Sequence, residues 1–154
     1  MIIIREAVQA DFPLLFPLWY ENLALTGQAD RFQYADISRE RWLHTASLWS
    51  QSPDHVILGM FDGQDAAGFV MGEIRLAPPG LGVDTLGVIT EFVVDAHNYR
   101  GGAAREMVAA LRDWFSERGV SQLAVMMPRS SVTGQAFWRA SGSVEWMQLL
   151  WVKS

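Results

Sequence analysis

The sequence contains no cysteine among its 154 residues. The chain therefore has no disulfide, no thiolate metal site and no cysteine nucleophile, which excludes several classes of enzyme. Histidine is scarce as well, and the three histidines, His44, His55 and His97, follow no spacing typical of metal ligands. We therefore expect the protein to work without a metal.

A long hydrophobic run is also missing. The apolar start of the chain is interrupted by Arg5, Glu6 and Asp11, too soon for a signal peptide or a membrane helix. The net charge of −5 and the isoelectric point near 5.1 leave no basic excess for binding nucleic acid. We expect a soluble cytoplasmic protein whose partners include neither membranes nor nucleic acid.

No repeat, low-complexity tract or linker divides the chain, and hydrophobic residues make up 50% of it. Residues 1–154 are therefore expected to form a single domain with a substantial core. Periodicity and turn residues predict strands over residues 1–7, 55–61, 67–77, 85–95 and 120–127, with one or two more over 144–152. Helices are predicted from Asp11 to Gly27, from Ser38 to Pro53, after Gly102 to Gly119, and from Ser130 or Ser131 through Ala140.

One junction in this mixed α/β (α+β) pattern has the chemistry of a phosphate site. A strand ending at Val94 and Asp95 is followed by Gly101, Gly102 and Ala103, and then by a helix. Small side chains let a phosphate approach the main chain, and the N-terminus of a helix offers unpaired N–H groups and partial positive charge. Taken alone, the glycines are explained equally well by a tight turn.

The surrounding residues resemble a known family. The stretch FVVDAHNYRGGAAREMVAAL, residues 92–111, looks like motif A of the GCN5-related N-acetyltransferases (GNATs), in which a Gln/Arg-x-x-Gly-x-Gly/Ala loop follows a strand. Gly102 and Ala104 match this loop, whereas Tyr99 replaces the first Gln/Arg and is followed by Arg100. Downstream, Phe137 and Gly142 align with the family's motif B.

The resemblance implies a mostly antiparallel mixed sheet flanked by helices, with central strands that splay apart to admit acetyl-CoA. Backbone groups of the strand and loop would hold the cofactor, and Arg100 and Arg105 either meet its phosphates or form a solvated helix face. Ser131 either caps the last helix or touches CoA. The cofactor-binding residues implied are Phe92, Val93, Val94, Tyr99, Arg100, Gly101, Gly102, Ala103, Ala104, Arg105, Ser131 and Phe137, with Met126 on the facing strand.

Glu91 is the candidate catalytic residue. It is an acidic side chain in an apolar strand, where burial would raise its pKa toward the range of a general base; the alternative is an edge-facing or ion-paired glutamate. Trp138 stands where motif B usually has tyrosine, and an indole cannot protonate a leaving thiolate. The general acid is therefore unassigned.

The leading hypothesis is an acetyl-CoA-dependent N-acetyltransferase acting on a small-molecule or peptide primary amine. Aromatic residues of the first half could wall the acceptor pocket, although Trp42 and Trp49 have the helical spacing of core residues. The second hypothesis is a non-catalytic CoA-binding module of the same fold, and the third an interaction protein unrelated to CoA. The apolar run 146–152 suggests a homodimer with an added strand.

Overall fold

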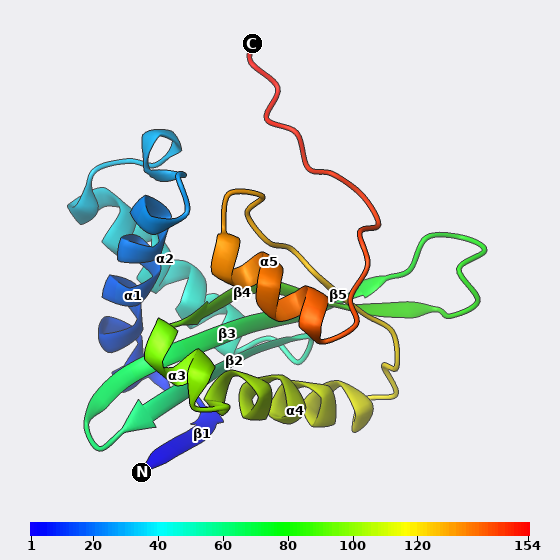
Figure 1. Cartoon of the computed structure of the whole chain (residues 1–154), viewed down its shortest axis with the longest axis horizontal. Helices are drawn as coiled ribbons and strands as arrows, with labels where there is room; N and C mark the ends of the chain where they lie inside the picture. Colours follow the sequence, from blue (N-terminus) through cyan, green and yellow to red (C-terminus); the bar gives the residue numbers. More distant parts are fainter.

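The computed structural model describes residues 1–154 and contains one five-stranded sheet in the order β1-β2-β3-β4-β5 (Figure 1). The first four strands are antiparallel, and β5 runs parallel to β4. The strands are β1 (Ile2–Glu6), β2 (His55–Asp62), β3 (Asp65–Leu76), β4 (Thr85–Val94) and β5 (Leu123–Val125).

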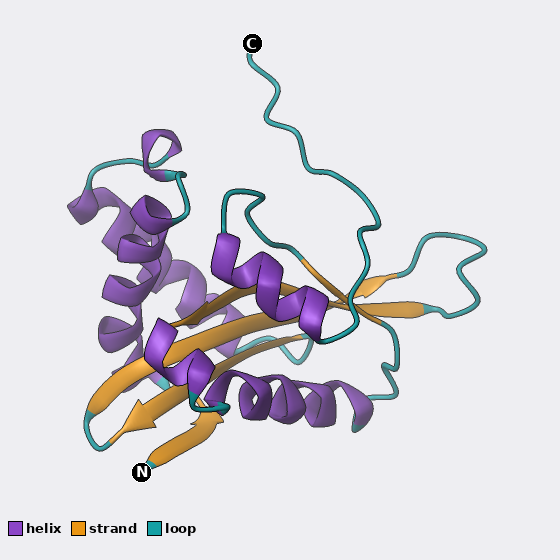
Figure 2. Cartoon of the chain, viewed as in Figure 1, coloured by secondary structure: helices purple, strands orange, loops and turns teal.

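Helices cover both faces of this sheet (Figure 2). None of them is long and apolar enough to cross a membrane. They are α1 (Phe12–Leu25), α2 (Ala35–Ser50), α3 (Ala96–Arg100), α4 (Ala103–Ser116) and α5 (Val132–Ala140), with short 3₁₀ helices η1 (Gln9–Asp11) and η2 (Ala29–Arg31).

The sheet separates the core into two sets of buried side chains that share no residue. Because side chains alternate along a strand, Val70 of β3 packs on α4, whereas its neighbours Phe69 and Met71 pack on α1 and α2. Fully buried Met107 and Leu111 anchor α4 to its face of the sheet. Each such side chain contributes about 1.5–3 kcal/mol of transfer free energy.

Most predicted elements are confirmed, and two helices differ. The second helix begins at Ala35 instead of Ser38, whose hydroxyl donates a hydrogen bond to Gln33 O at 2.8 Å within the first turn. The short helix α3 was predicted as loop. It forms because the Asp95 carboxylate accepts hydrogen bonds from the N–H groups of His97 and Asn98, which are otherwise unpaired at a helix start.

The C-terminal predictions were wrong in extent. The strand expected over 120–127 has only the three residues of β5, because pairing with β4 ends at Val125. Residues 144–152 form no strand, and the chain beyond α5 extends away from the sheet without a partner (Figure 1). An isolated segment has no ladder of hydrogen bonds to hold it as a strand.

Candidate active site

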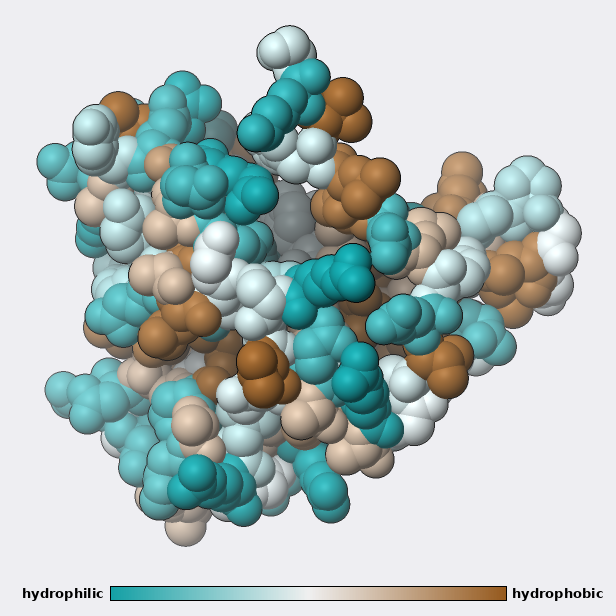
Figure 3. Space-filling model, turned by 45° about the horizontal axis from the view of Figure 1, so that its top comes forward, coloured by the Kyte–Doolittle hydropathy of each residue, from teal (hydrophilic) through white to brown (hydrophobic).

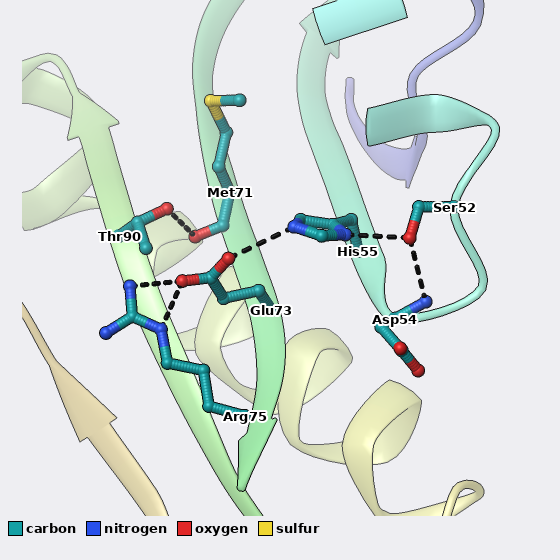
Figure 4. Close-up of polar contacts among 7 residues, drawn as sticks. All are labelled: Ser52, Asp54, His55, Met71, Glu73, Arg75 and Thr90. Carbon is teal, nitrogen blue, oxygen red and sulfur yellow. Dashed lines mark hydrogen bonds and ion pairs between the residues drawn. The ribbon is translucent and has the colours of Figure 1, made fainter. Parts of the chain in front are cut away.

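The site begins where β4 and β5 separate. Met71 of β3 pairs with Glu91 and Gly72 pairs with Ile89, so Thr90 is an extra residue that makes a β-bulge in β4. The Thr90 hydroxyl donates to Met71 O at 3.3 Å (Figure 4). The last contact of β4 with the segment after it is a hydrogen bond from Met126 N to Ile89 O at 2.8 Å. Beyond Ile89 the two strands part, at the place where the bulge bends β4.

The split leaves peptide groups of β4 without a strand partner. Asp95 N donates to the oxygen of Ala67 in β3, so the peptide groups of Asp95 face β3. Peptide groups alternate in direction along a strand. Val93, which pairs with Phe69, therefore uses its peptide groups within the sheet, whereas those of Phe92 and Val94 face the opening. An extended ligand with amide groups could lie along this edge as a strand would.

The glycine turn at residues 101–104, which the sequence predicts as a phosphate site and which we call the cradle, follows the end of β4. Gly102 is the N-cap of α4 and has φ +83, a left-handed conformation that favours glycine. No atom lies within 4 Å of the position that a Cβ on Gly102 would occupy, so its surface is open. Ala103 and Ala104 bury their methyl groups in the core, which leaves only their N–H groups to meet a ligand. Arg100 and Arg105 are exposed on either side of this turn.

A groove of about 240 Å³ lies between α4 and α5. Arg105 and Arg112, two helical turns apart on α4, lie along one wall, and Phe137 of α5 lines the other. Arg112 was not singled out from the sequence. Its spacing of seven residues from Arg105 was the available signal.

An aromatic cluster packs beneath this groove. The ring of Phe92 stacks on Phe137 with centroids 5.4 Å apart, and Tyr99 meets Phe137 edge-on at 5.2 Å. Burial raises the pKa of the Tyr99 hydroxyl to about 12. Tyr99 thus acts as packing for the loop, where the GNAT pattern has a polar side chain. Trp138 is buried against Phe92 at 5.3 Å.

Glu91 faces the opposite side of the sheet, toward α1. The indole N–H of Trp19 donates to Glu91 Oε1 at 3.3 Å, and no cation is paired with this carboxylate. Burial raises the pKa of Glu91 to about 7, and the weaker effect of the Trp19 hydrogen bond lowers it. Phe32 packs edge-on against Trp19 at 5.4 Å and is 41% exposed. Glu91 therefore has the charge properties of a base near neutral pH.

Comparison with solved structures relates this arrangement to known proteins, although no protein-family model and no curated protein matches the sequence. A predicted acetyltransferase from Clostridium acetobutylicum, solved with acetyl-CoA, matches with a TM-score of 0.80 at 15% identity over 99% of this chain and 96% of that one. An aminoglycoside 6′-N-acetyltransferase from Acinetobacter haemolyticus has a TM-score of 0.77 at 16% identity over 99% and 97%. A transcriptional regulator from Bacillus halodurans has a TM-score of 0.82 at 12% identity over 100% of both chains.

The chain has the GNAT fold. The resemblance inferred from residues 92–111 and the structural match therefore agree, and the predicted splay of the central strands is present. Within the GNAT fold, the cradle, the split and Glu91 come from β4 and the two helices that follow it.

Two serines before α5 have separate functions. Ser131 Oγ accepts a hydrogen bond from Gly134 N at 3.3 Å, so the N-cap interpretation is confirmed. Ser130 Oγ donates to Thr26 O at the end of α1. This contact joins the first and last quarters of the chain beside the end of β5. Neither Thr26 nor Ser130 was predicted as a site residue, because residues 104 positions apart carry no local signal.

The other aromatic and histidine candidates lie elsewhere in the GNAT fold. Trp42 is buried between α1, α2 and β3, and Trp49 packs on His55 with ring centroids 4.6 Å apart. His55 bridges Ser52 at 2.8 Å and Glu73 at 3.0 Å, and Glu73 also pairs with Arg75 (Figure 4). No group of three His, Asp or Glu side chains converges in a way that could hold a metal. The contacts among Ser52, His55, Glu73 and Arg75 hold the start of β2 against β3.

Proposed function

We propose that the chain is a single-domain cytoplasmic enzyme that transfers an acetyl group from acetyl-CoA to a primary amine. The observation that carries the proposal is that β4 and the turn after it place, one after another, the carboxylate of Glu91, the free peptide groups of Phe92 and Val94, and the open helix start at Gly102. The fold match to a structure solved with acetyl-CoA supports the choice of cofactor.

Different groups in this part of the chain would bind different parts of CoA. The N–H groups at the start of α4 would meet the pyrophosphate, aided by Arg100. The amides of the pantetheine arm would pair with Phe92 and Val94, with the segment at Met126 forming the other wall. Arg105 and Arg112 would bind the 3′-phosphate in the groove that Phe137 lines.

Acetyl-CoA supplies a thioester, whose carbonyl an amine nitrogen attacks with loss of the thiolate. The part that this chain plays is to deliver the amine uncharged. Glu91, ionised above a pKa of about 7, accepts the proton of the ammonium directly or through one water. Trp138 is buried and its indole does not release a proton, so we assign no side chain as general acid.

The acceptor would approach from the α1 side, past Trp19 and the exposed edge of Phe32. We propose a small molecule or an exposed peptide amine as acceptor. The match to an aminoglycoside 6′-N-acetyltransferase supports the first of these, because that protein is described as acting on an aminoglycoside antibiotic. The exposed carboxylates Glu21, Asp30 and Asp36 on the same half of the chain favour a cationic acceptor.

A second candidate function is a CoA-binding module without catalysis. Buried Trp138 in place of the usual tyrosine favours it, as does the match to a transcriptional regulator. The two functions differ in one measurement, the release of CoA thiol over a panel of amines. Tight CoA binding with no thiol released from any acceptor would establish the module and exclude the enzyme.

Cofactor binding is tested by Gly102→Glu, measured by isothermal titration with CoA. A carboxylate at the cradle should weaken CoA binding at least roughly tenfold, about 1.4 kcal/mol, by charge repulsion. Two controls isolate the charge. Gly102→Gln has the same size and the same left-handed strain, and Gly80→Glu adds the same charge at a glycine with φ +87 in the β3–β4 loop, at the other end of the sheet.

We expect Gly102→Gln to lose less affinity than Gly102→Glu, and Gly80→Glu to bind CoA as the parent does. If all three variants bind CoA as tightly as the parent does, the cradle is excluded as the site that binds the phosphates of CoA. No binding of CoA by the parent protein would leave the third hypothesis, an interaction protein, in place.

A further inference from the structure

Trp19 of α1 makes the one side-chain hydrogen bond that the Glu91 carboxylate receives. Its indole N–H donates to Glu91 Oε1 at 3.3 Å. No titratable side chain of α1, α2 or β3 forms a hydrogen bond or an ion pair with Glu91, and burial and Trp19 are the causes of its pKa shift. The carboxylate therefore has a single hydrogen-bonding side chain beside it, and that side chain is neutral.

The indole is held in place by other aromatic rings and not by the carboxylate. Trp19 is 9% exposed, and its ring packs edge-on against Phe32 with centroids 5.4 Å apart. The ring of Phe16 lies 6.0 Å and that of Trp42 6.4 Å from it, both tilted. A donor whose rotamer is fixed by packing loses little further freedom when it forms a hydrogen bond. The aromatic cluster thus brings a preorganised N–H group to one oxygen of Glu91.

The two oxygens of the Glu91 carboxylate have different surroundings. Oε1 accepts from Trp19, whereas Oε2 receives no hydrogen bond from the protein. Every fully buried side-chain oxygen or nitrogen in the structure has a hydrogen-bond partner, so Oε2, which has none, is in contact with solvent. Between the helices α1 and α2 and the C-terminal tail, residues 143–154, the surface of the molecule is hollowed (Figure 3). Oε2 is therefore the oxygen of Glu91 that an incoming molecule can reach.

The chemistry of indole determines where Glu91 can carry a proton. An indole N–H donates a hydrogen bond and accepts none. Trp19 can therefore bond to Oε1 in either protonation state of Glu91, and a proton taken up by the carboxylate has to sit on Oε2. An arginine in the same place would also donate, but its charge would hold the pKa of the carboxyl low and weaken it as a base. A neutral donor orients the carboxylate and leaves most of its basicity in place.

We propose that Trp19 is a positioning residue, which holds Oε1 of Glu91 and so presents Oε2 to the ammonium group of the acceptor. The inference rests on the proposed function of Glu91 as a base. An N–H bond of the ammonium breaks, its electron pair stays on nitrogen, and the proton forms an O–H bond at Oε2. The uncharged amine then attacks the thioester, and the carboxylic acid returns its proton to solvent from the same oxygen.

Trp19→Phe tests the inference through the pH profile of acetyl transfer. Phenylalanine keeps a ring in the cluster and removes the N–H group that stabilises the ionised carboxylate. We expect the midpoint of the rise in kcat/KM to move upward by roughly one pH unit, the effect of losing a hydrogen bond to a charged group. The plateau of kcat/KM should fall by roughly tenfold, because the carboxylate is no longer oriented.

Trp42→Phe is the matched control, since it removes an indole from the same cluster without removing a hydrogen bond to Glu91. Its midpoint should equal that of the parent, whatever the loss of packing does to the plateau. Equal midpoints in the parent, Trp19→Phe and Trp42→Phe would overturn the proposal, because a residue that only packs behaves in this way.

A second measurement depends neither on activity nor on the folding of Trp19→Phe. The chain has seven tryptophans and therefore seven indole N–H signals in a ¹⁵N NMR spectrum. One of them should shift with pH, with a midpoint near the pKa of about 7 of Glu91, and this shift should be absent from Glu91→Gln. If no indole signal loses its pH dependence in Glu91→Gln, the proposal is overturned. A responding signal that remains in the spectrum of Trp19→Phe belongs to another tryptophan and also contradicts it.

The two measurements separate this inference from the proposed function. Thiol release by a protein whose indole signals ignore Glu91 would exclude Trp19 as the positioning residue and leave the transferase in place. A responding Trp19 signal without thiol release from any amine would exclude the transferase, and with it the proton transfer at Oε2, while the contact between Trp19 and Glu91 stands.

Discussion

At the scale of single residues, Glu91 decides between binding and catalysis. Its position was predicted from one feature, an acidic residue within an apolar strand, and the structure shows it half-buried, without a cationic partner, and bonded to Trp19. Trp19 could not be paired with Glu91 from the sequence, because 72 residues separate them. A buried carboxylate held by a neutral donor keeps a pKa near neutrality, where it can exchange protons.

The pH dependence of acetyl transfer tests this assignment. For the parent protein we expect kcat/KM to rise with pH and level off above about 7, as Glu91 ionises. Glu91→Gln should lower kcat/KM by roughly 10²- to 10⁴-fold and remove this rise, while CoA binding by titration stays unchanged. Glu117→Gln, which removes an exposed carboxylate at the end of α4, is the control. Full activity in Glu91→Gln would remove Glu91 from the mechanism.

At the scale of elements, the stretch from β4 to α4 was the most predictable part. Glycine positions, the strand run and the amphipathic helix are local signals, and all three are present in the structure. The bulge at Thr90 was not predictable, because a threonine suits either a regular or a bulged strand. Helix α3 was missed, although Asp95 as an N-cap was a usable signal. Val93 was expected in the site, and its peptide groups prove to be used by β3.

The groove between α4 and α5 gives a prediction about two arginines. Arg105→Gln combined with Arg112→Gln should weaken binding of CoA by roughly tenfold or more, because two charge-assisted contacts to a phosphate are lost. The same variant should bind 3′-dephospho-CoA as well as the parent does. Arg39→Gln, on the surface of α2, serves as the control. An equal loss for both ligands would place the arginines elsewhere on the cofactor.

At the scale of the whole molecule, Glu91 couples stability to pH. Its pKa is raised on folding from 4.5 to about 7, so the folded state holds a proton that the unfolded state releases. The stabilisation is complete below the unfolded pKa and is lost as pH rises through the folded pKa, with a full effect of about 3 kcal/mol.

Denaturant unfolding at pH 5 and pH 8 measures this coupling. From pH 5 to pH 8, the free energy of unfolding of the parent should decrease more than that of Glu91→Gln, because the variant has no proton to release at this position. The inactive variant should thus be the more stable protein at pH 8. The same pH slope in both proteins would show that Glu91 titrates as an exposed carboxylate does.

The whole chain also shows where sequence-based reasoning stops. Apart from α3, the order of strands and α-helices through α5 follows from local patterns, and so does the class of fold. The tail was predicted as strand from its apolar residues, yet a strand depends on a partner, and in the structure no strand pairs with the tail. The contact of Ser130 with Thr26 and the groove at Arg112 arise only when distant segments pack together.

The separation of the core into two sets by the sheet has a consequence for how such a protein can diverge. Substitutions among the residues under α1 and α2 change the walls near Glu91 without altering any side chain that supports α4 and the cradle. Effects at sites without shared partners are close to additive. On the proposed function, one face of the sheet can therefore be remodelled for new acceptors while the other continues to hold CoA. A library confined to Phe16, Trp19, Leu23, Phe32 and Trp42 would sample that freedom directly.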